Sequence, residues 1–324
     1  MQAPRNGLLK YMMKQLNELK TFLKKKNVPF LEDVSLSSYC SFKIGGISPL
    51  ICEAENNDHI FLFISEVQRL AIPWKILGGG TNILISDHPD DFVILQLGGE
   101  FKEYSEMEEG LFRIGAAALT TPVFRKISQS GYTGLEFLST IPGSVGGAVI
   151  QNAGCYGGEL FDFTLDVEFI REGRLYKEKR ENIQYGYRNT QFLKNKDSLI
   201  TSVTMTAQKG DIILIEESLK EKRDKRNSSQ PPNKKSAGSV FKNPNIPDEK
   251  GNTLKAWQLI DRAGLRGISK GGARIAEEHC NFIVNTGGAT AADVHYLIQL
   301  ILEKVSRTSG ILLEREIEFF GQIP

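Results

Sequence analysis

Two glycine-rich segments are the parts of this sequence best suited to hold a large polar ligand. The first, residues 77–84, reads Leu-Gly-Gly-Gly-Thr-Asn-Ile-Leu. Because glycine has no Cβ atom, such a main chain can approach a ligand closely and turn its N–H groups toward phosphate oxygens. It is neither a Walker loop nor a dinucleotide fingerprint, since Ile83 stands at the third glycine position and a strand pattern follows. On its own, a tight turn between strands explains it slightly better.

The second segment is residues 134–158, and it carries no charged side chain from residue 137 onward. At its centre, residues 141–147 read Ile-Pro-Gly-Ser-Val-Gly-Gly, where most side chains are small or missing. Gln-Asn-Ala-Gly follows at 151–154. Ordering so much glycine costs conformational entropy, and the proline and six glycines of the uncharged run argue against a membrane helix. We therefore expect a backbone-rich loop that wraps a polar cofactor; the alternative is a buried, irregular connection.

Two further motifs carry groups that could bind anions or donate protons. Arg188 stands beside Tyr187, where an aromatic ring could hold the guanidinium rigid for two-point binding of an anion. By itself, a surface salt bridge is the simpler explanation. Ser239 lies on a small-residue stretch and is followed by Lys242 and Asn243. The G-x-S-x-G elbow of serine hydrolases is missing there, so the alternative is a strand end with a capping serine.

The last acidic motif is a set of alternating glutamates near the end of the chain. Glu314, Glu316 and Glu318 would share one face of a strand expected over residues 311–320, with mostly apolar neighbours on the other face. The strand is either a half-solvated edge, or it aims one of these carboxyl groups into a cleft.

The elements that must position these groups alternate between strands and helices, which indicates an α+β or α/β unit. Apolar periodicity predicts helices over residues 8–26, 57–70 (capped by Asn57 or Asp58), 122–130, 254–263 and 293–308. A charged helix followed by a linker is expected over 217–235. Strands are expected over 49–54, 73–77, 83–86, 92–97, 111–118, 198–207, 211–216 and 311–320, with a hairpin over 165–176.

Composition sets limits on what the chain does. Its 324 residues predict two or three domains, and 40 basic against 39 acidic residues, a net charge of +1, give no electrostatic reason to expect nucleic-acid or membrane binding. Four unpaired cysteines and no convincing signal sequence favour reduced thiols in the cytoplasm. The four histidines lack metal-ligand spacing, so no metal is expected.

The order and wording of the motifs together are specific. From about Ser41 onward the chain resembles the UDP-N-acetylenolpyruvoylglucosamine reductase family, also called UDP-N-acetylmuramate dehydrogenase. The resemblance is carried by Ser-Phe-Lys-Ile-Gly-Gly at 41–46, the two glycine-rich segments, Tyr-Arg at 187–188, Gly-Ser-Val-Phe-Lys-Asn-Pro at 238–244, Ala-Trp-Gln-Leu-Ile-Asp at 256–261, His-Cys-Asn-Phe-Ile-Val-Asn at 279–285 and Leu-Glu-Arg-Glu-Ile at 313–317. Cys155 and Ala276 stand where alanine and serine would be expected.

The resemblance implies an α+β fold: a two-subdomain FAD-binding fold of the vanillyl-alcohol-oxidase (PCMH) type and a carboxyl-terminal α+β substrate-binding domain. The implied boundaries are a helical extension at 1–30, FAD-binding subdomains at 31–98 and 99–216, and a substrate domain at 217–324. It also implies non-covalent FAD, NADPH as the reductant, and reduction of UDP-N-acetylglucosamine enolpyruvate in cell-wall precursor synthesis by a cytoplasmic monomer.

Carried over residue by residue, the resemblance implies a catalytic set of Arg188, Ser239 and Glu316. Tyr187, Lys242 and Asn243 would contact the substrate. The implied FAD contacts are Gly78, Gly79, Gly80, Thr81, Asn82, Ile83, Leu84, Gly115, Ser139, Thr140, Pro142, Gly143, Ser144, Gly146, Gly147, Asn152 and Gly154. Only 51 positions separate Arg188 from Ser239, which is similar to the subgroup that lacks an inserted substrate-clamping loop.

Two other functions stay open at this point. The chain could be a different flavin oxidoreductase with the same FAD-binding fold, although Ser239 and Glu316 in these contexts argue against it. It could also bind a nucleotide sugar without turnover.

Overall fold

The computed structural model describes residues 5–89, 92–195, 197–231, 235–247, 251 and 253–323, with side chains from residue 12 onward. The chain divides into two compact units, each made of several segments. Unit 1 comprises Met1–Val34, Ser48–Gly79 and Asp90–Leu219, and unit 2 comprises Ser35–Ile47, Gly80–Pro89 and Lys220–Pro324. Two early segments of the chain therefore belong to the same unit as its carboxyl-terminal third.

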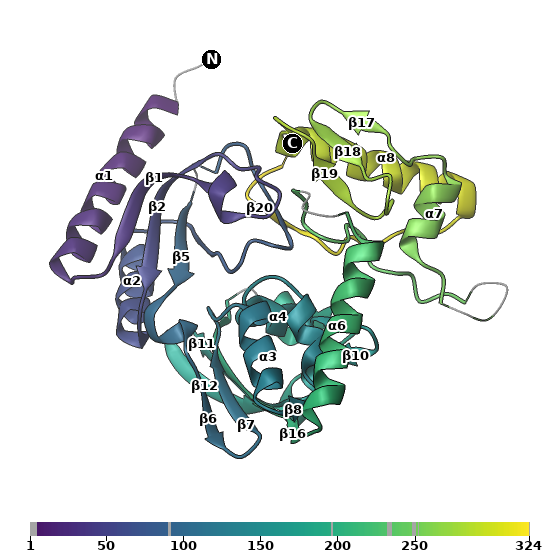
Figure 1. The fold of residues 1–324 in the computed structure, drawn as a ribbon. Coiled ribbons are helices and arrows are strands. Elements are labelled where there is room, and N and C mark those ends of the chain that lie inside the picture. Colours follow the sequence, from purple (N-terminus) through teal and green to yellow (C-terminus); the bar gives the residue numbers. More distant parts are fainter. Residues whose placement is uncertain are drawn as a thin grey trace. The chain divides into compact units, whose positions relative to one another are not determined.

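The first sheet of unit 1 has the strand order β1-β2-β5-β3, with β5 parallel to both β2 and β3. Two helices, α1 and α2, pack against each other (Figure 1), and the buried side chains Leu19, Leu23, Phe63 and Val67 join one core with the strands. The bounds are α1 (Arg5–Lys25), β1 (Phe30–Ser35), β2 (Ile47–Ala54), α2 (Asn57–Arg69), β3 (Trp74–Ile76) and β5 (Val93–Leu97). The strands and helices predicted for residues 8–97 are thus confirmed in kind.

The cap predicted for α2 is wrong by one position. Asn56, not Asn57 or Asp58, has the extended backbone of a capping residue, and its Oδ1 accepts a hydrogen bond of 2.9 Å from the N–H of His59. Three neighbouring residues of cap-forming type occupy 56–58, so composition alone cannot select among them. The backbone torsions of Asn56 make the choice.

The second sheet of unit 1 is antiparallel, with strand order β12-β11-β15-β7-β6. Its central strand β15 is buried along most of its length, whereas the edge strands β12 and β6 are exposed. The hairpin predicted around Glu172 and Gly173 is confirmed, and both residues have positive φ, as a two-residue hairpin turn requires. The bounds are β6 (Tyr104–Glu108), β7 (Leu111–Gly115), β11 (Thr164–Arg171), β12 (Arg174–Lys179) and β15 (Leu199–Thr206).

Smaller elements complete unit 1. They are α3 (Thr120–Gln129), α4 (Val145–Gln151), α5 (Gln191–Lys194), β8 (Tyr132–Thr133), β9 (Gly154–Cys155), β10 (Gly158–Glu159), β13 (Tyr185–Gly186), β14 (Asn189–Thr190) and β16 (Gln208–Lys209). The glycine-rich segment is more regular than the expected loop. It contains a 3-10 helix (Glu136–Thr140) and α4, because Val145, Ala148 and Val149 recur at helical spacing and are buried.

The strand expected over residues 211–216 is wrong, because these residues begin the helix α6 (Ile212–Ser229). The apolar run Ile212, Ile213 and Leu214 suggested a strand, but all three side chains are exposed and only Ile215 is buried. Asp211 accepts a hydrogen bond of 2.8 Å from the N–H of Ile213, which satisfies a donor of the first helical turn.

Within the described residues, no helix is both long and apolar enough to span a membrane.

Unit 2 contains the antiparallel sheet β17-β18-β19 (Figure 1). Helix α8 packs against β17 and β18, and α7 packs against α8. The bounds are α7 (Ala256–Arg262), β17 (Ser269–Lys270), β18 (Ala273–Ile275), β19 (Ile283–Asn285) and α8 (Ala291–Ser309). Thr290 and Asp293 form a capping box at the start of α8, and Gly310 ends the helix in the left-handed conformation. The helices predicted over 254–263 and 293–308 are confirmed.

The final strand is shorter than predicted. Only β20 (Glu318–Phe320) forms a ladder, in parallel with β4 (Ile83–Ile85), whereas residues 311–317 form no ladder and have a single bridge, from Arg315 to Phe241. Glu314 and Glu316 therefore lie on an irregular segment, not on one strand face with Glu318. The alternating pattern was real, but the hydrogen-bonding partners needed for a long strand are not aligned with it.

We expect Asn56→Ala to lower the free energy of unfolding by about 1 kcal/mol, because it removes the side-chain acceptor at the start of α2. Asn57→Ala is the matched control: it alters the first helical residue and should change stability far less. Urea unfolding of both variants measures this, and equal losses would contradict the assignment of Asn56 as the cap.

Candidate functional site

The two glycine-rich segments meet inside unit 1. The N–H of Gly79 donates to the Ser144 hydroxyl over 3.2 Å. A Cβ atom on Gly79 would lie 2.7 Å from both the Cα of Gly143 and the N of Ser144. Real Cβ atoms do not approach main chain this closely, so only glycine permits the contact. The result is a joint surface of main chain and one hydroxyl, bare of bulky side chains, built from the two segments that the sequence singled out.

Ser144 links the two segments to the helix behind them. Its Oγ also accepts from the N–H of Gly147 over 3.4 Å, as the cap of α4. Gly146 is placed by packing, because its N–H donates to the Ala116 carbonyl at 2.8 Å and an added Cβ would lie 2.9 Å from the Ala116 Cβ. Gly115 has its own close backbone neighbour, the Phe101 carbonyl.

Other predicted cofactor contacts have internal partners in unit 1. The Ser139 hydroxyl donates to the Glu136 carbonyl and that of Thr140 to the Phe137 carbonyl, each at 2.7 Å, so both are buried in the 3-10 turn. Pro142 follows this turn in the sequence and precedes Gly143, which has a φ of 123°.

Arg188 is held by main-chain carbonyls of unit 1. Its guanidinium donates to the carbonyl of Asn152 at 3.3 Å and to that of Gly154, and it lies 3.9 Å from Glu159. Its side chain is only 16% exposed and stacks over the Tyr187 ring, with 5.0 Å from Cζ to the ring centroid. The simple surface salt bridge is therefore an incomplete description, because the guanidinium is fixed from several sides.

The backbone of Arg188 is also unusual. Its φ of 49° lies in the left-handed region, at the two-residue tip between β13 and β14. A non-glycine residue there costs on the order of 1 kcal/mol or more, and such outliers cluster at functional sites. The fully buried Asn152 supports this tip, because its amide donates to the Gly186 carbonyl at 3.1 Å and to Glu159 at 2.7 Å.

Ser239 and Glu316 lie on neighbouring segments of unit 2. The N–H of Glu316 donates to the carbonyl of Val240, the residue after Ser239, over 2.8 Å. Gly238 precedes the serine with a φ of 77°, a conformation that glycine adopts without strain. The structure thus brings together two predicted catalytic residues that are far apart in the sequence, through a main-chain contact.

Lys242 and Asn243 continue the Ser239 segment. Lys242 forms a 2.5 Å ion pair with Glu314, and its N–H donates to the Glu314 carbonyl at 2.9 Å. The Asn243 side-chain oxygen accepts from the N–H of Ala256 at 3.0 Å. Arg315 lies over the Phe319 ring, 3.5 Å from its centroid, and burial lowers the pKa of its guanidinium.

The remaining predicted cofactor residues, from Gly80 to Leu84, belong to unit 2. Asn82 donates from its amide to the Glu316 carbonyl at 3.1 Å and accepts from the N–H of Glu318 at 3.0 Å. Ile83 and Leu84 lie in β4 beside β20. Gly80 packs against the Tyr39 carbonyl, and Thr81 lies between Gly80 and Asn82. Asn82 therefore supports the Glu316 segment, a role that sequence reasoning missed.

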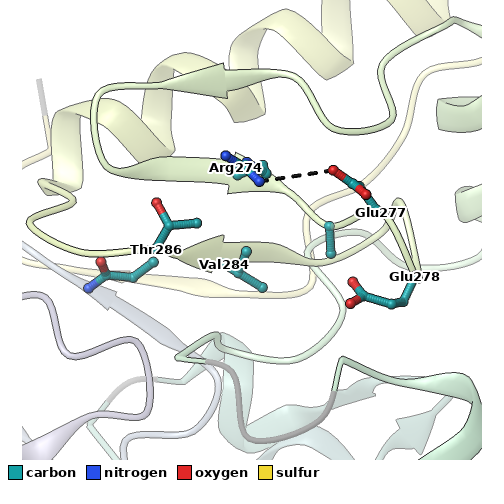
Figure 2. A pocket seen from close by; sticks show the side chains of 7 residues that line it. Arg274, Glu277, Glu278, Val284 and Thr286 are labelled. Carbon is teal, nitrogen blue, oxygen red and sulfur yellow. Dashed lines mark ion pairs between the residues drawn. The ribbon is translucent and has the colours of Figure 1, made fainter.

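Unit 2 also contains a small hollow of about 290 Å³ beside β18 and β19. Figure 2 shows the Arg274–Glu277 ion pair at this hollow, with Val284 on the adjacent strand. Its lining is Arg274, Ala276, Glu277, Glu278, Val284, Asn285 and Thr286, and includes none of the residues predicted for the site.

Two other groups of unit 2 have shifted pKa values. The hydrogen bond from Arg266 lowers the pKa of Asp261, and burial raises the pKa of Cys280 to about 11.

Comparison with known proteins decides the family. A family model described as "UDP-N-acetylenolpyruvoylglucosamine reductase, C-terminal domain" matches residues 230–320, and one described as "FAD binding domain" matches residues 49–174. The UDP-N-acetylenolpyruvoylglucosamine reductase of Leptospira interrogans (serovar Lai, strain 56601) is 59% identical over 310 residues, which cover 96% of this chain and 98% of the relative. The chain belongs to the UDP-N-acetylenolpyruvoylglucosamine reductase family.

More distant members of the family match this chain over nearly the same length. The reductase of Orientia tsutsugamushi (strain Ikeda) is 36% identical over 304 residues, covering 93% of this chain and 97% of that one. The crystal structure of the family member from Thermus caldophilus has a TM-score of 0.75 at 31% identity, covering 91% and 99% of the two chains. The predicted α+β class is confirmed: the chain contains an FAD binding domain and a carboxyl-terminal part of mixed helices and strands.

The residues present fit FAD. A flavin dinucleotide offers a diphosphate, which main-chain N–H groups and a hydroxyl recognise well. The main chain of Gly79, Gly143 and Ser144 carries such groups, two of these residues have no side chain, and all three lie within the matched FAD binding domain.

We expect Gly79→Ala to weaken FAD binding at least about tenfold, because the added Cβ must push the two segments apart. Gly98→Ala is the matched control in unit 1, since its Cβ would meet no atom closer than 3.8 Å. Titration of the two apoproteins with FAD, followed by flavin fluorescence, gives both affinities. An unchanged affinity in a folded Gly79→Ala protein would remove this surface from the cofactor site.

Proposed function

We propose that this chain uses FAD and NADPH to reduce UDP-N-acetylglucosamine enolpyruvate to UDP-N-acetylmuramate, as a monomer in the cytoplasm, in the synthesis of peptidoglycan precursor. Residues 31–98 and 99–216 would hold FAD and residues 217–324 the substrate. Family membership supports the activity and argues against a flavin enzyme acting on an unrelated substrate. The single observation that carries the chemistry is the 2.8 Å hydrogen bond that holds the segments of Ser239 and Glu316 side by side.

The reaction adds a hydride and a proton across a carbon–carbon double bond. When bound, FAD would take two electrons from NADPH and supply the hydride to the terminal carbon of the enolpyruvyl group. Negative charge then develops on the adjacent carbon and spreads into the carboxylate. The chain must stabilise this charge and supply the proton.

Arg188 is suited to stabilise the charge. Its planar guanidinium carries five N–H donors, and the carbonyls of Asn152 and Gly154 hold it in place before the substrate arrives. Donors fixed in advance stabilise developing charge without reorganising during the reaction. Glu316, with a proton on its carboxyl group or sharing one, would assist in stabilising the charge, and Tyr187 would contact the substrate.

Ser239 is suited to supply the proton. Its hydroxyl is a weak acid, but a carbanion is a strong enough base to accept the proton. The half-buried position of Ser239 limits access of bulk water. Lys242, three residues further on and 14% exposed, would return a proton to the serine, and Lys242 and Asn243 would contact the substrate.

Arg188→Ala and Glu316→Gln should each spare reduction of the flavin by NADPH but slow its reoxidation by substrate about a hundredfold or more. Arg188→Lys should restore little, because an ammonium cannot reproduce the two-point geometry. Arg180→Ala is the control, since Arg180 also donates to a main-chain carbonyl of unit 1, that of Phe161, outside the proposed site. Stopped-flow absorbance measures both half-reactions, and normal reoxidation in both site variants would reject these roles.

Ser239→Ala should fold and bind FAD, and reoxidation of its reduced form by saturating substrate should slow by roughly a hundred- to ten-thousand-fold. Ser239→Cys should recover part of the rate, since a thiol can donate a proton from nearly the same place. Ser236→Ala is the control in the same segment. A normal reoxidation rate in Ser239→Ala would end the assignment of Ser239 as the acid.

The non-catalytic alternative makes a different prediction. A protein that only binds a nucleotide sugar would purify without a flavin spectrum, or its flavin colour would survive addition of NADPH. Loss of the visible flavin absorbance on adding NADPH, and its return on adding substrate under anaerobic conditions, would exclude that alternative.

A further inference from the structure

Asn281 forms a three-point clamp on the segment that follows Ser239. Its side-chain oxygen accepts from the N–H of Phe241 at 3.0 Å, and its amide donates to the carbonyl of the same residue at 2.8 Å. Its main-chain carbonyl accepts from the N–H of Val240 at 2.8 Å. The side chain is only 3% exposed. One buried amide therefore satisfies both main-chain groups of Phe241, much as a neighbouring strand would.

The clamp matters because the Ser239 segment has few other sources of regular structure. Residues 236–244 form one isolated bridge, from Phe241 to Arg315, but no strand ladder, and Gly238 has a left-handed backbone. The Glu316 segment is hydrogen-bonded to the same residues, since the Val240 carbonyl accepts from the N–H of Glu316. Without the clamp, the peptide units that set the position of the Ser239 hydroxyl would lose their partners on one side.

We propose that Asn281 is a positioning residue for the reaction, which holds the Ser239 hydroxyl in the place from which it donates the proton. The proposal rests on the proposed function, in which Ser239 is the acid. Asn281 acts through the main chain of Val240 and Phe241, and its own side chain is occupied by these bonds. The rate of proton transfer depends steeply on the distance between donor and acceptor, so a displacement of the hydroxyl on the order of 1 Å is enough to slow the transfer markedly.

The chemistry of the amide explains why asparagine occupies this place. Phe241 presents one donor and one acceptor, and only a side chain with both can satisfy them together. Leucine has a similar shape but neither group, and aspartate keeps the acceptor but loses the donor. Asn281→Leu therefore removes both side-chain points of the clamp and Asn281→Asp removes one, whereas the main-chain bond from Val240 to Asn281 is kept in both.

The test measures single-turnover reoxidation of the NADPH-reduced, FAD-loaded enzyme by UDP-N-acetylglucosamine enolpyruvate. Asn281→Leu should slow the limiting rate roughly tenfold to a hundredfold, with flavin reduction by NADPH and the half-saturating substrate concentration unchanged within about threefold. Asn281→Asp should fall between Asn281→Leu and the unaltered protein. If Asn281→Leu does not accumulate as FAD-loaded protein, the same comparison is made with Asn281→Asp, and a normal limiting rate there overturns the proposal.

A matched control separates positioning from general loss of stability. Thr290→Val removes the side-chain cap of α8 in the same unit and keeps the residue shape. It should lower thermal stability but leave the limiting rate of reoxidation unchanged. A rate loss in Thr290→Val as large as that in Asn281→Leu would show that any destabilised unit 2 is slow, and would overturn the proposal.

A double variant tests whether Asn281 acts through Ser239. Once Ser239→Ala has removed the proton donor, adding Asn281→Leu should slow reoxidation no further, because there is no hydroxyl left to position. Multiplying rate losses would overturn the inference. A slow Ser239→Ala beside a normal Asn281→Leu would overturn the inference alone, whereas a normal Ser239→Ala would remove the proposed acid and, with it, any role for Asn281 in positioning.

Discussion

The carbonyl of Val240 accepts the N–H of Glu316, and the N–H of the same residue donates to the carbonyl of Asn281. Three segments of unit 2 are thereby joined through one residue, Val240, directly after Ser239. Ser239, the proposed acid, and Glu316 both lie on irregular backbone, so neither is placed by a helix or a long strand. Their positions depend on these main-chain hydrogen bonds and on the asparagine amides that complete them.

The same solution recurs in both units. Asn281 satisfies the main chain of Phe241, Asn82 holds the carbonyl of Glu316, and in unit 1 the buried Asn152 supports the hairpin tip that carries Arg188. An asparagine amide offers a donor and an acceptor on a short, stiff side chain. It can therefore replace a missing strand neighbour where the backbone must leave regular structure to present a functional group.

The glycine-rich surface in unit 1 illustrates a different constraint. Gly79 and Gly143 touch through their main chains, and the hydroxyl of Ser144 accepts from the N–H groups of both Gly79 and Gly147. Composition revealed that the backbone would be exposed to a ligand or packed very closely. In the structure, the main chains of the two segments pack closely against each other at Gly79 and Gly143. This packing forms the surface that fits FAD. In this chain the glycines thus have a packing role beside the binding role proposed for them.

The sequence alone determined the family, through the order of short motifs, and most helices and strands, through apolar periodicity. It also singled out Arg188, Ser239 and Glu316 by resemblance, and these assignments stay predictions. It failed where local pattern and tertiary environment disagree: the apolar run at 212–215 begins a largely exposed helix, and residues 311–317 alternate but find no continuous partner strand. Only the tertiary structure decided that Gly79 meets Gly143, that Asn56 caps α2, and that Asn281 clamps the Ser239 segment. The physical reason is that each of these contacts ends on main-chain atoms, which every residue carries, so the sequence shows the glycine or asparagine but not the segment that it contacts.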